Sequence, residues 1–340
     1  MDKERQMPKD FFWGNSVSSM QTEGAWDEDG KGRSVYDVRP ATATTSDWHD
    51  AIDEYHRYEE DLDLMKDLHL NMYRIQISWS RVVPDGDGEF NAAGIAFYDR
   101  LVDAMLARGI TPMICLYHFD MPLALAENEN GFMSRHTVDA FVRFGEKMIA
   151  HFADWVKYWI VFNEHNLYFT DEVFNISGYT KGDQSVNDLY RIFHHTMLAH
   201  ARLDDFVHQN YDDVKIGGML AYTTVYPETA KPIDIMAARK SDEFLNNNLN
   251  DAYVHGHYSP EVLRYVEQQG IDYDLQPGDE AIIGKMKADF LAFSYYRSTV
   301  INGDKIPVDA VQNRYLNYSF EANRFLQANE WGWAIDPLGF

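Results

Sequence analysis

The feature that most constrains the fold is a series of six short apolar segments separated by longer amphipathic ones. The apolar segments span residues 11–19, 72–79, 111–118, 158–163, 214–221 and 290–296. They are rich in Ile, Val, Phe and Tyr, and several are apolar on both faces, as buried parallel strands are. Six strand–helix units in series therefore predict an α/β protein with a parallel sheet.

Helical periodicity occupies the segments between the predicted strands. Apolar residues recur every three or four positions from Ile52 to Leu68, and the acidic residues between them are expected to form a solvated face. A second helix is expected over 91–108, closed by Gly109 as a left-handed cap before the next strand. Further helices are expected near 135–156, 185–209, 235–252 and 259–269.

Two architectures suit such a chain, a doubly wound sheet and a (β/α)8 TIM barrel. No G-x-G-x-x-G follows any predicted strand, which removes the dinucleotide-binding fingerprint of the first. Polar residues stand at the carboxyl ends of the strands, namely Gln21, Ser80, His118, Asn163, Glu164 and Tyr296. In a barrel these ends meet at one mouth, where active sites lie. The sequence favours a barrel as one domain over 1–340, although six strands are visible and closure needs eight.

Composition excludes several classes of function. The 54 acidic and 30 basic residues give a net charge of −24, which argues against binding to nucleic acid or to anionic membranes. No apolar stretch approaches the ~20 residues of a membrane span, and the first ten residues lack the apolar core of a signal peptide. The one cysteine, Cys115, excludes an intrachain disulfide and lies in an apolar run, where a buried inert thiol is expected. These features predict a cytoplasmic protein.

Motifs for metal, phosphate and serine-nucleophile chemistry are weak or absent. Thirteen histidines include the pair His194-His195 and the group His255-Gly256-His257, but there is no H-E-x-x-H and no cysteine pair. We therefore expect these histidines to pack in the core or on helix surfaces rather than to bind a metal ion. No P-loop and no G-x-S-x-G occurs. We expect no cofactor.

Glu164 is a catalytic candidate because it directly follows an apolar strand that ends at Asn163. A carboxylate in a partly desolvated barrel mouth can act as a general acid. Position alone leaves a second interpretation open, an acidic residue favoured by the positive end of a helix. His118 ends the third strand and Gln21 follows the first, and each taken alone is also explained as an ordinary polar residue. A glutamine suits two adjacent sugar hydroxyls because it offers one donor group and one acceptor.

Several segments taken together resemble glycoside hydrolase family 1. They are FFWGNSVSSMQTEGA at 11–25, YHRYEED at 55–61, YRIQISWSR at 73–81, LYHFDMP at 116–122, FNE at 162–164, FSYY at 293–296 and EWGW at 330–333. The resemblance covers the whole chain in order and is highly specific as a set. It implies a TIM barrel and a retaining β-glycosidase that acts without a metal or cofactor.

The resemblance implies a role for each matching residue. Glu164 matches the general acid/base, Asn163 matches the residue that binds the sugar 2-hydroxyl, and Gln21 and His118 match residues that bind glycone hydroxyls.

Further matches concern the second carboxylate and the leaving-group side. Arg74 and Tyr296 match the pair that holds and orients the nucleophilic carboxylate, and Tyr296 also counts as substrate-binding. Trp333 resembles an aromatic residue on the aglycone side. His165 and Phe119 stand where the family commonly has Pro and Trp, and both are expected to reshape the sugar pocket.

Within the family the resemblance is strongest to bacterial 6-phospho-β-glucosidases. It is carried by IGGMLAYTTVYPETAKP at 216–232 and by Ser294, where plain β-glucosidases usually have Asn before the two tyrosines. The implied substrate is a 6-phospho-β-glucoside. A plain β-glucosidase and a catalytically dead remnant that only binds sugar remain alternatives, and a homo-oligomer is left open.

The family's nucleophile is not found in the sequence. Retaining hydrolysis needs two carboxylates about 5–5.5 Å apart, and the second one lies in a Thr/Val-Glu-Asn-Gly segment that ends the seventh strand of the family. The segment ENENG at 127–131 follows no apolar strand and predicts a surface loop. Strands seven and eight, the nucleophile and the phosphate site are thus expected to be absent, with open sheet edges at strands one and six. Asp120 and Glu23 are the first alternatives for a nucleophile.

Overall fold

The computed structural model describes residues 7–340, so the first six residues of the segment inspected for a signal peptide lie outside it. One sheet has six strands in the order β1-β2-β3-β4-β5-β7, and every neighbouring pair is parallel. The strands are β1 Gly14–Ser16, β2 Met72–Gln76, β3 Thr111–Tyr117, β4 Tyr158–Phe162, β5 Lys215–Tyr222 and β7 Phe290–Tyr295. All six predicted strands are confirmed, and β1 is much shorter than expected because the chain turns into helix α1 (Ser19–Thr22).

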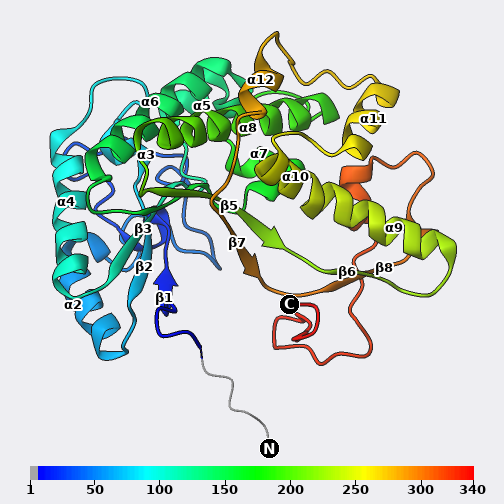
Figure 1. The fold of residues 1–340 in the computed structure, drawn as a ribbon, viewed down its shortest axis with the longest axis horizontal. Coiled ribbons are helices and arrows are strands. Elements are labelled where there is room, and N and C mark those ends of the chain that lie inside the picture. Colours follow the sequence, from blue (N-terminus) through cyan, green and yellow to red (C-terminus); the bar gives the residue numbers. More distant parts are fainter. Residues whose placement is uncertain (1–6) are drawn as a thin grey trace, which may run out of the picture.

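The sheet is curled (Figure 1). Side chains from strands that are not neighbours therefore meet on its inner face. Arg74 on β2 donates from Nη1 to the sulfur of Met219 on β5 at 2.9 Å. The Tyr158 ring on β4 contacts the rings of Phe12, at 5.6 Å, and Phe290, at 6.4 Å. Within residues 7–340, β1 pairs only with β2 and β7 only with β5. The prediction of an α/β fold of the barrel type is confirmed, with six of its parallel strands.

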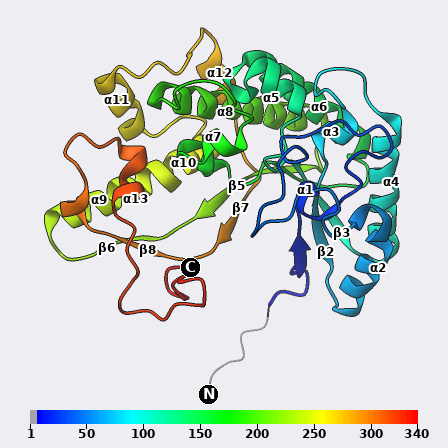
Figure 2. The same ribbon diagram turned by 180° about the vertical axis from the view of Figure 1, so that it is seen from behind.

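Helices cover the outer face of the curled sheet (Figures 1 and 2). The longer helices of the chain are α2 Glu54–Asp67, α4 Ala92–Ala107, α6 Arg135–Phe152, α8 Val186–Asn210, α9 Pro232–Asp242, α10 Asn248–His255 and α11 Pro260–Gln269, of which α9 packs against residues of the later segment around Ile301. The shorter ones are α3 Trp79–Val82, α5 Leu123–Glu129, α7 Val173–Ile176, α12 Asp279–Ile283 and α13 Tyr315–Tyr318. The helix expected over 235–252 is divided into α9 and α10 by a π-helical turn at Glu243–Asn247. No helix within the described residues combines the length and the apolar character needed to cross a lipid bilayer.

Two expectations about helices are corrected by the structure. The segment 127–131 is not a surface loop, because it contains the end of α5, which Asn130 closes in a left-handed conformation with φ of 60°. The acidic residues near α2 do not all lie on a solvated face. Glu54 is buried and accepts hydrogen bonds from Thr22 and Tyr73.

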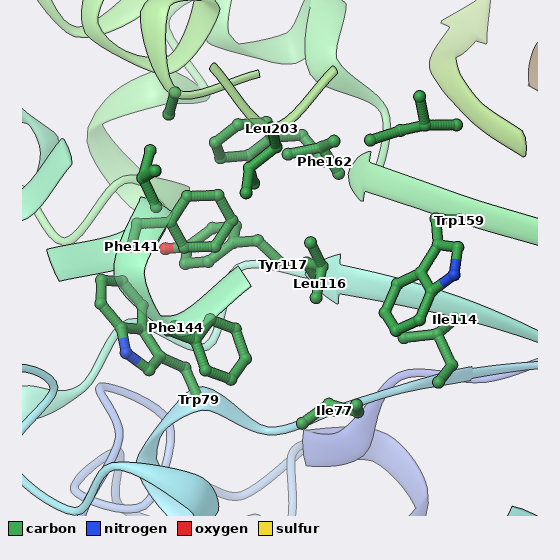
Figure 3. Packing of buried hydrophobic residues seen from close by; sticks show 14 of the residues in the cluster. Ile77, Trp79, Ile114, Leu116, Tyr117, Phe141, Phe144, Trp159, Phe162 and Leu203 are labelled. Atoms are coloured by element: carbon green, nitrogen blue, oxygen red, sulfur yellow. The ribbon is translucent and has the colours of Figure 1, made fainter. Parts of the chain in front are cut away.

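A layer of aromatic side chains joins the sheet to the outer helices (Figure 3). The Trp79 ring stacks on Phe144 with centroids 5.7 Å apart, and Tyr117 meets the edge of Phe141 at 5.9 Å. All four side chains are fully buried. Full burial of one large apolar side chain stabilises a fold by about 1.5–3 kcal/mol, so this layer holds α3 and α6 against the end of β3.

A smaller apolar cluster lies on the inner face of the sheet. It joins Cys115, Ile160 and Met219 from β3, β4 and β5. Cys115 is fully buried, as expected, and burial raises the pKa of its thiol to about 11. The thiol therefore stays protonated and unreactive at neutral pH.

The chain after β5 forms a second, two-stranded parallel sheet that the sequence did not predict. Its strands are β6 Val225–Pro227 and β8 Thr299–Ile301. The last residues of the chain pack back toward the main sheet beside β7 (Figure 1). The Phe340 ring lies 5.7 Å from that of Phe293 and 5.3 Å from that of Tyr295.

Candidate active site

A cavity of about 370 Å³ lies at the carboxyl ends of the parallel strands. Six of the predicted site residues line it: Gln21, Arg74, His118, Asn163, Glu164 and Tyr296. The seventh, Trp333, lies just outside this lining and meets the Tyr296 ring edge-on at a centroid distance of 5.6 Å. Residues on β2 or directly after β3, β4 and β7, together with Gln21 of α1, thus converge at one end of the sheet, where the geometry of parallel strands places them.

Glu164 is almost fully buried, with 7% of its surface exposed, and accepts a hydrogen bond of 2.6 Å at Oε1 from the Tyr296 hydroxyl. The backbone amide of Asn163 donates to the Tyr117 carbonyl at 2.9 Å, which is the last link between β4 and β3. Directly after it, Glu164 adopts a left-handed conformation with φ of 46°. Such a conformation costs about 1–2 kcal/mol for a residue other than glycine, so the surroundings must hold it in place.

His165 provides part of this hold. Its ring points away from the cavity into the core, where Nδ1 lies 2.7 Å from the Tyr253 hydroxyl and Nε2 lies 2.8 Å from Thr196 Oγ1. Burial lowers the pKa of His165 far below its usual range, so the ring is neutral. The side chain does not line the cavity, so the expected effect of His165 on the sugar pocket stays a prediction and would act through the backbone at Glu164. Phe119, the other departure from the family pattern, does line it.

Arg74 is the cation of the cavity. Its Nη1 donates to Asn163 Oδ1 at 2.9 Å, which orients the Asn163 amide toward the interior of the cavity. The guanidinium is buried, and its Nε has no hydrogen-bond partner among residues 7–340. A buried arginine with an unused donor is suited to holding an anionic group in the cavity.

His118 and Tyr296 are neutral hydrogen-bonding groups at neutral pH. Burial and the neighbouring Arg74 charge lower the pKa of His118 to about 3. Burial and the hydrogen bond to Glu164 raise the pKa of Tyr296 to about 12. His118 therefore offers one donor and one acceptor nitrogen, while the Tyr296 hydroxyl stays protonated and donates.

Gln21 is exposed at the mouth of the cavity, and its Oε1 accepts a hydrogen bond of 2.6 Å from Ser18 Oγ. The sequence did not single out five other lining residues: Ser16, Val17, Met20, Tyr36 and Trp48. Ser294, which the resemblance to 6-phospho-β-glucosidases singled out, also lines the cavity. Tyr36 and Trp48 come from the long segment between α1 and α2, which has no periodic pattern that could place them.

The two alternative nucleophiles do not face the cavity that Glu164 lines. Glu23 is buried, where Arg81 Nε donates to it at 2.9 Å and the Tyr98 hydroxyl also donates. Asp120 accepts from Ser19 Oγ at 3.0 Å and from Gln76 Nε2. Both residues border a separate, smaller cavity. Glu164 is the single carboxylate among the described residues that line the large cavity.

The histidine pair His194-His195 is buried and lies beside carboxylates. His194 Nε2 lies 3.0 Å from Asp279, and His195 Nε2 lies 3.0 Å from Asp274. No group of three or more His, Cys, Asp or Glu side chains within residues 7–340 is arranged to hold a metal ion.

Comparison with known proteins places the chain in a family. A family model described as "Glycosyl hydrolase family 1" matches residues 3–340. This chain belongs to glycosyl hydrolase family 1. The family 1 chain is 36% identical to "Aryl-phospho-beta-D-glucosidase BglC" of Bacillus subtilis (strain 168), over 98% of this chain and 73% of that protein. It is 35% identical to a "6-phospho-beta-glucosidase" of Dickeya chrysanthemi, over 98% and 72%.

Solved structures of other family 1 proteins share the fold of this family 1 chain. The "Family 1 b-glucosidase from Thermotoga maritima" superposes with a TM-score of 0.85 at 30% identity, over 98% of this chain and 73% of that one. The "Beta-glucosidase from Thermotoga maritima in complex with deoxynojirimycin" superposes with a TM-score of 0.84 at 29% identity, over the same shares of the two chains.

Proposed function

We propose that the cavity of this family 1 chain binds the sugar of 6-phospho-β-glucosides and that Glu164 is the general acid/base of a retaining hydrolysis. The observation that carries the proposal is the hydrogen bond between the Tyr296 hydroxyl and Glu164, at 2.6 Å, inside a cavity lined by neutral donors and acceptors. In the first step Glu164 gives its proton to the oxygen of the leaving group. In the second it removes a proton from the attacking water.

The other cavity residues would bind and orient the sugar. Gln21 and His118 offer donor–acceptor pairs for glycone hydroxyls. Asn163, oriented by Arg74 at 2.9 Å, would bind the 2-hydroxyl. The attacking carboxylate must stand about 5–5.5 Å from the acid/base, and it must come from outside the lining formed by residues 7–340. Arg74 and Tyr296 would hold that carboxylate.

The substrate class is proposed from the relatives. Proteins named as phospho-β-glucosidases are among the most similar curated ones, at 35–36% identity, and Ser294 lies in the lining of the cavity. A plain β-glucoside is the second candidate, because the structures that superpose on the chain are titled as β-glucosidases. Sugar binding without hydrolysis is the third.

The proposal can be tested by calorimetric titration with phenyl 1-thio-β-glucoside, its 6-phosphate, and deoxynojirimycin. The sulfur link prevents hydrolysis, so binding is measured separately from turnover. We expect all three to bind, the 6-phosphate more tightly than its parent. Absence of binding by all three would exclude the site, and a preference for the unphosphorylated glucoside would favour a plain β-glucosidase.

Substitution of Glu164 tests its role in the same assay. Deoxynojirimycin is a basic amine and should interact with the Glu164 carboxylate, so Glu164→Gln should weaken its binding about 10- to 100-fold, the usual range for a hydrogen bond to a charged group. The matched control is Glu127→Gln, which removes an exposed carboxylate on α5. Equal affinities of the two variants would contradict the assignment.

A further inference from the structure

A row of contacting side chains runs outward from Glu164 through the rings of Tyr296 and Trp333 and ends at Arg297. The Tyr296 hydroxyl bonds to Glu164, and the Tyr296 ring meets Trp333 at 5.6 Å. The guanidinium carbon of Arg297 in turn lies 5.6 Å from the centre of the Trp333 ring and 4.4 Å from that of Phe320. Two aromatic faces therefore hold this cation next to the rim of the cavity.

The charge of Arg297 is not neutralised by the residues around it. The chain has 54 acidic residues, yet no carboxylate within residues 7–340 forms an ion pair with Arg297. Arg81 and Arg314, by contrast, each pair with a carboxylate at 2.9 Å. Burial lowers the pKa of the Arg297 guanidinium, and no neighbouring anion offsets this effect. Ring faces attract a cation but do not satisfy the five N–H donors of an arginine.

These donors are suited to a carboxylate or a phosphate. The planar fork of a guanidinium binds two oxygens of such a group at once, and aromatic stacking fixes its orientation beforehand. Tyr296 is half-exposed, so the row of rings runs from the buried acid/base to the open side of the cavity. A leaving group that receives its proton from Glu164 must leave through that open side.

We propose that Arg297, held between Phe320 and Trp333, binds an anionic group carried by the leaving group of the β-glycoside. The proposal rests on the proposed function of the cavity. The sugar's own 6-phosphate offers the same chemistry, but it is attached to the ring that Glu164 faces. An aryl leaving group lying along Trp333 places its para substituent one ring further out, toward Arg297.

The test is calorimetric titration of the full chain with four non-hydrolysable ligands. These are phenyl 1-thio-β-glucoside, its 4-carboxyphenyl and 4-carbamoylphenyl analogues, and phenyl 1-thio-β-glucoside 6-phosphate. The carboxylate and the carbamoyl group have nearly the same shape, so their comparison isolates the charge. We expect the carboxylate to bind about 10-fold more tightly at low salt, and added salt should reduce this preference.

Arg297→Gln should abolish the preference for the carboxylate and leave the affinity for the neutral phenyl ligand unchanged. The matched control is Arg324→Gln, because Arg324 also lies over an aromatic ring, that of Phe325 at 4.9 Å, whereas Arg297 lies over Trp333. It should keep the preference.

Four outcomes would overturn the proposal. A preference that survives Arg297→Gln excludes Arg297 as the anion-binding group. A loss only for the 6-phosphate assigns Arg297 to the sugar. Equal weakening of all four ligands together with a lower melting temperature shows a structural role. Failure of every ligand to bind the wild-type chain overturns the proposed function itself, and this inference with it.

Discussion

At the scale of single residues, burial rather than pairing determines which side chains of the site are charged. His118 and Tyr296 are both neutral over the physiological range because their pKa values lie at about 3 and about 12. In the lining formed by the described residues, Arg74 supplies the guanidinium and Glu164 the single carboxyl group. Sugar hydroxyls would therefore meet neutral hydrogen-bonding groups at His118 and Tyr296.

Replacing His165 by Phe should destabilise the fold while leaving the lining of the cavity unchanged. Phe fills a similar volume, but the Tyr253 hydroxyl and Thr196 Oγ1 would each lose a partner in the core. A buried polar group without its partner costs about 1–3 kcal/mol. We expect a clearly lower melting temperature by calorimetry. His255→Phe, at an exposed position, is the control, and an equal effect in both variants would contradict this account.

Asp120 should make stability depend on pH. Burial raises its pKa to about 7, against about 3.9 in an unfolded chain. The stability linked to its protonated form is thus fully present below about pH 4 and is lost as the pH rises through 7. Between pH 4 and 8, the melting temperature of Asp120→Asn should increase relative to that of the wild type as the pH rises. A difference in melting temperature that stays constant across this range would refute the link between stability and Asp120 protonation. Glu127→Gln is the control for loss of a surface charge.

Motif resemblance alone predicted Arg74, which lies within β2, whereas strand ends and resemblance together predicted the other residues near β3 and β4. Glu164 and Asn163 directly follow β4, and His118 directly follows β3, so their shared location follows from the parallel sheet. Glu23 could not be excluded as a nucleophile, because its partners Arg81 and Tyr98 lie far away in the sequence.

At the scale of helices and strands, β5 depends on a close approach by α10. A Cβ atom at Gly218 would lie 2.1 Å from the Tyr253 ring, and this ring also positions His165. Gly218→Ala should therefore cost about 1–3 kcal/mol through overpacking and should weaken deoxynojirimycin binding.

Gly109→Ala provides the comparison for this substitution. Gly109 has a φ of 74° and no atom within 4 Å of an added Cβ, so it should lose about 1–2 kcal/mol from backbone conformation alone and keep its affinity for deoxynojirimycin. Unchanged affinity for deoxynojirimycin in both variants would show that the packing of β5 against α10 does not affect ligand binding at the site.

The fold elements differ in how well the sequence specifies them. Strands β2 to β5 were predicted because they are buried on both faces. β6 and β8 have three residues each, which is too short for any periodicity to emerge. Residues 127–131 have the polar composition of a turn and so predict a loop. Residues 127–129 instead end α5, where Lys181 Nζ donates to the Glu127 carbonyl and the Ser134 hydroxyl donates to Glu129, each at 2.7 Å.

At the scale of the whole molecule, the large cavity supports binding more completely than it supports catalysis. Glu164 is its single carboxylate among the described residues, and double displacement requires two. We expect a purified polypeptide of these 340 residues to bind thioglucosides but to hydrolyse aryl β-glucosides and their 6-phosphates at negligible rates. Loss of the nucleophile costs about 10⁶-fold in the well-studied case of subtilisin. Normal turnover by a mass-verified sample would contradict this expectation and would require another carboxylate to move into the cavity.

In a polypeptide of these 340 residues, the β7 edge of the sheet should promote self-association. β7 has one hydrogen-bonded neighbour within residues 7–340, and Leu291 on its outer face is 45% exposed. Exposed apolar edge strands are sites of aggregation, and a lysine on such an edge opposes pairing with another chain. Leu291→Lys should reduce concentration-dependent association in sedimentation experiments with little change in melting temperature. Lys287→Arg, a charge-conserving change outside the strand, is the control, and unaltered association would show that this edge is not responsible.

The left-handed backbone of Glu164 has a consequence for how this position can evolve. Glycine adopts a φ of 46° without strain, so Glu164→Gly would relieve backbone strain even as it removes the carboxylate and its bond to Tyr296. Selection for thermal stability alone would then tolerate or favour loss of the acid, whereas β-branched residues would be rejected on conformational grounds. A mutational scan read out by folding and one read out by ligand binding should rank the substitutions at this position in different orders.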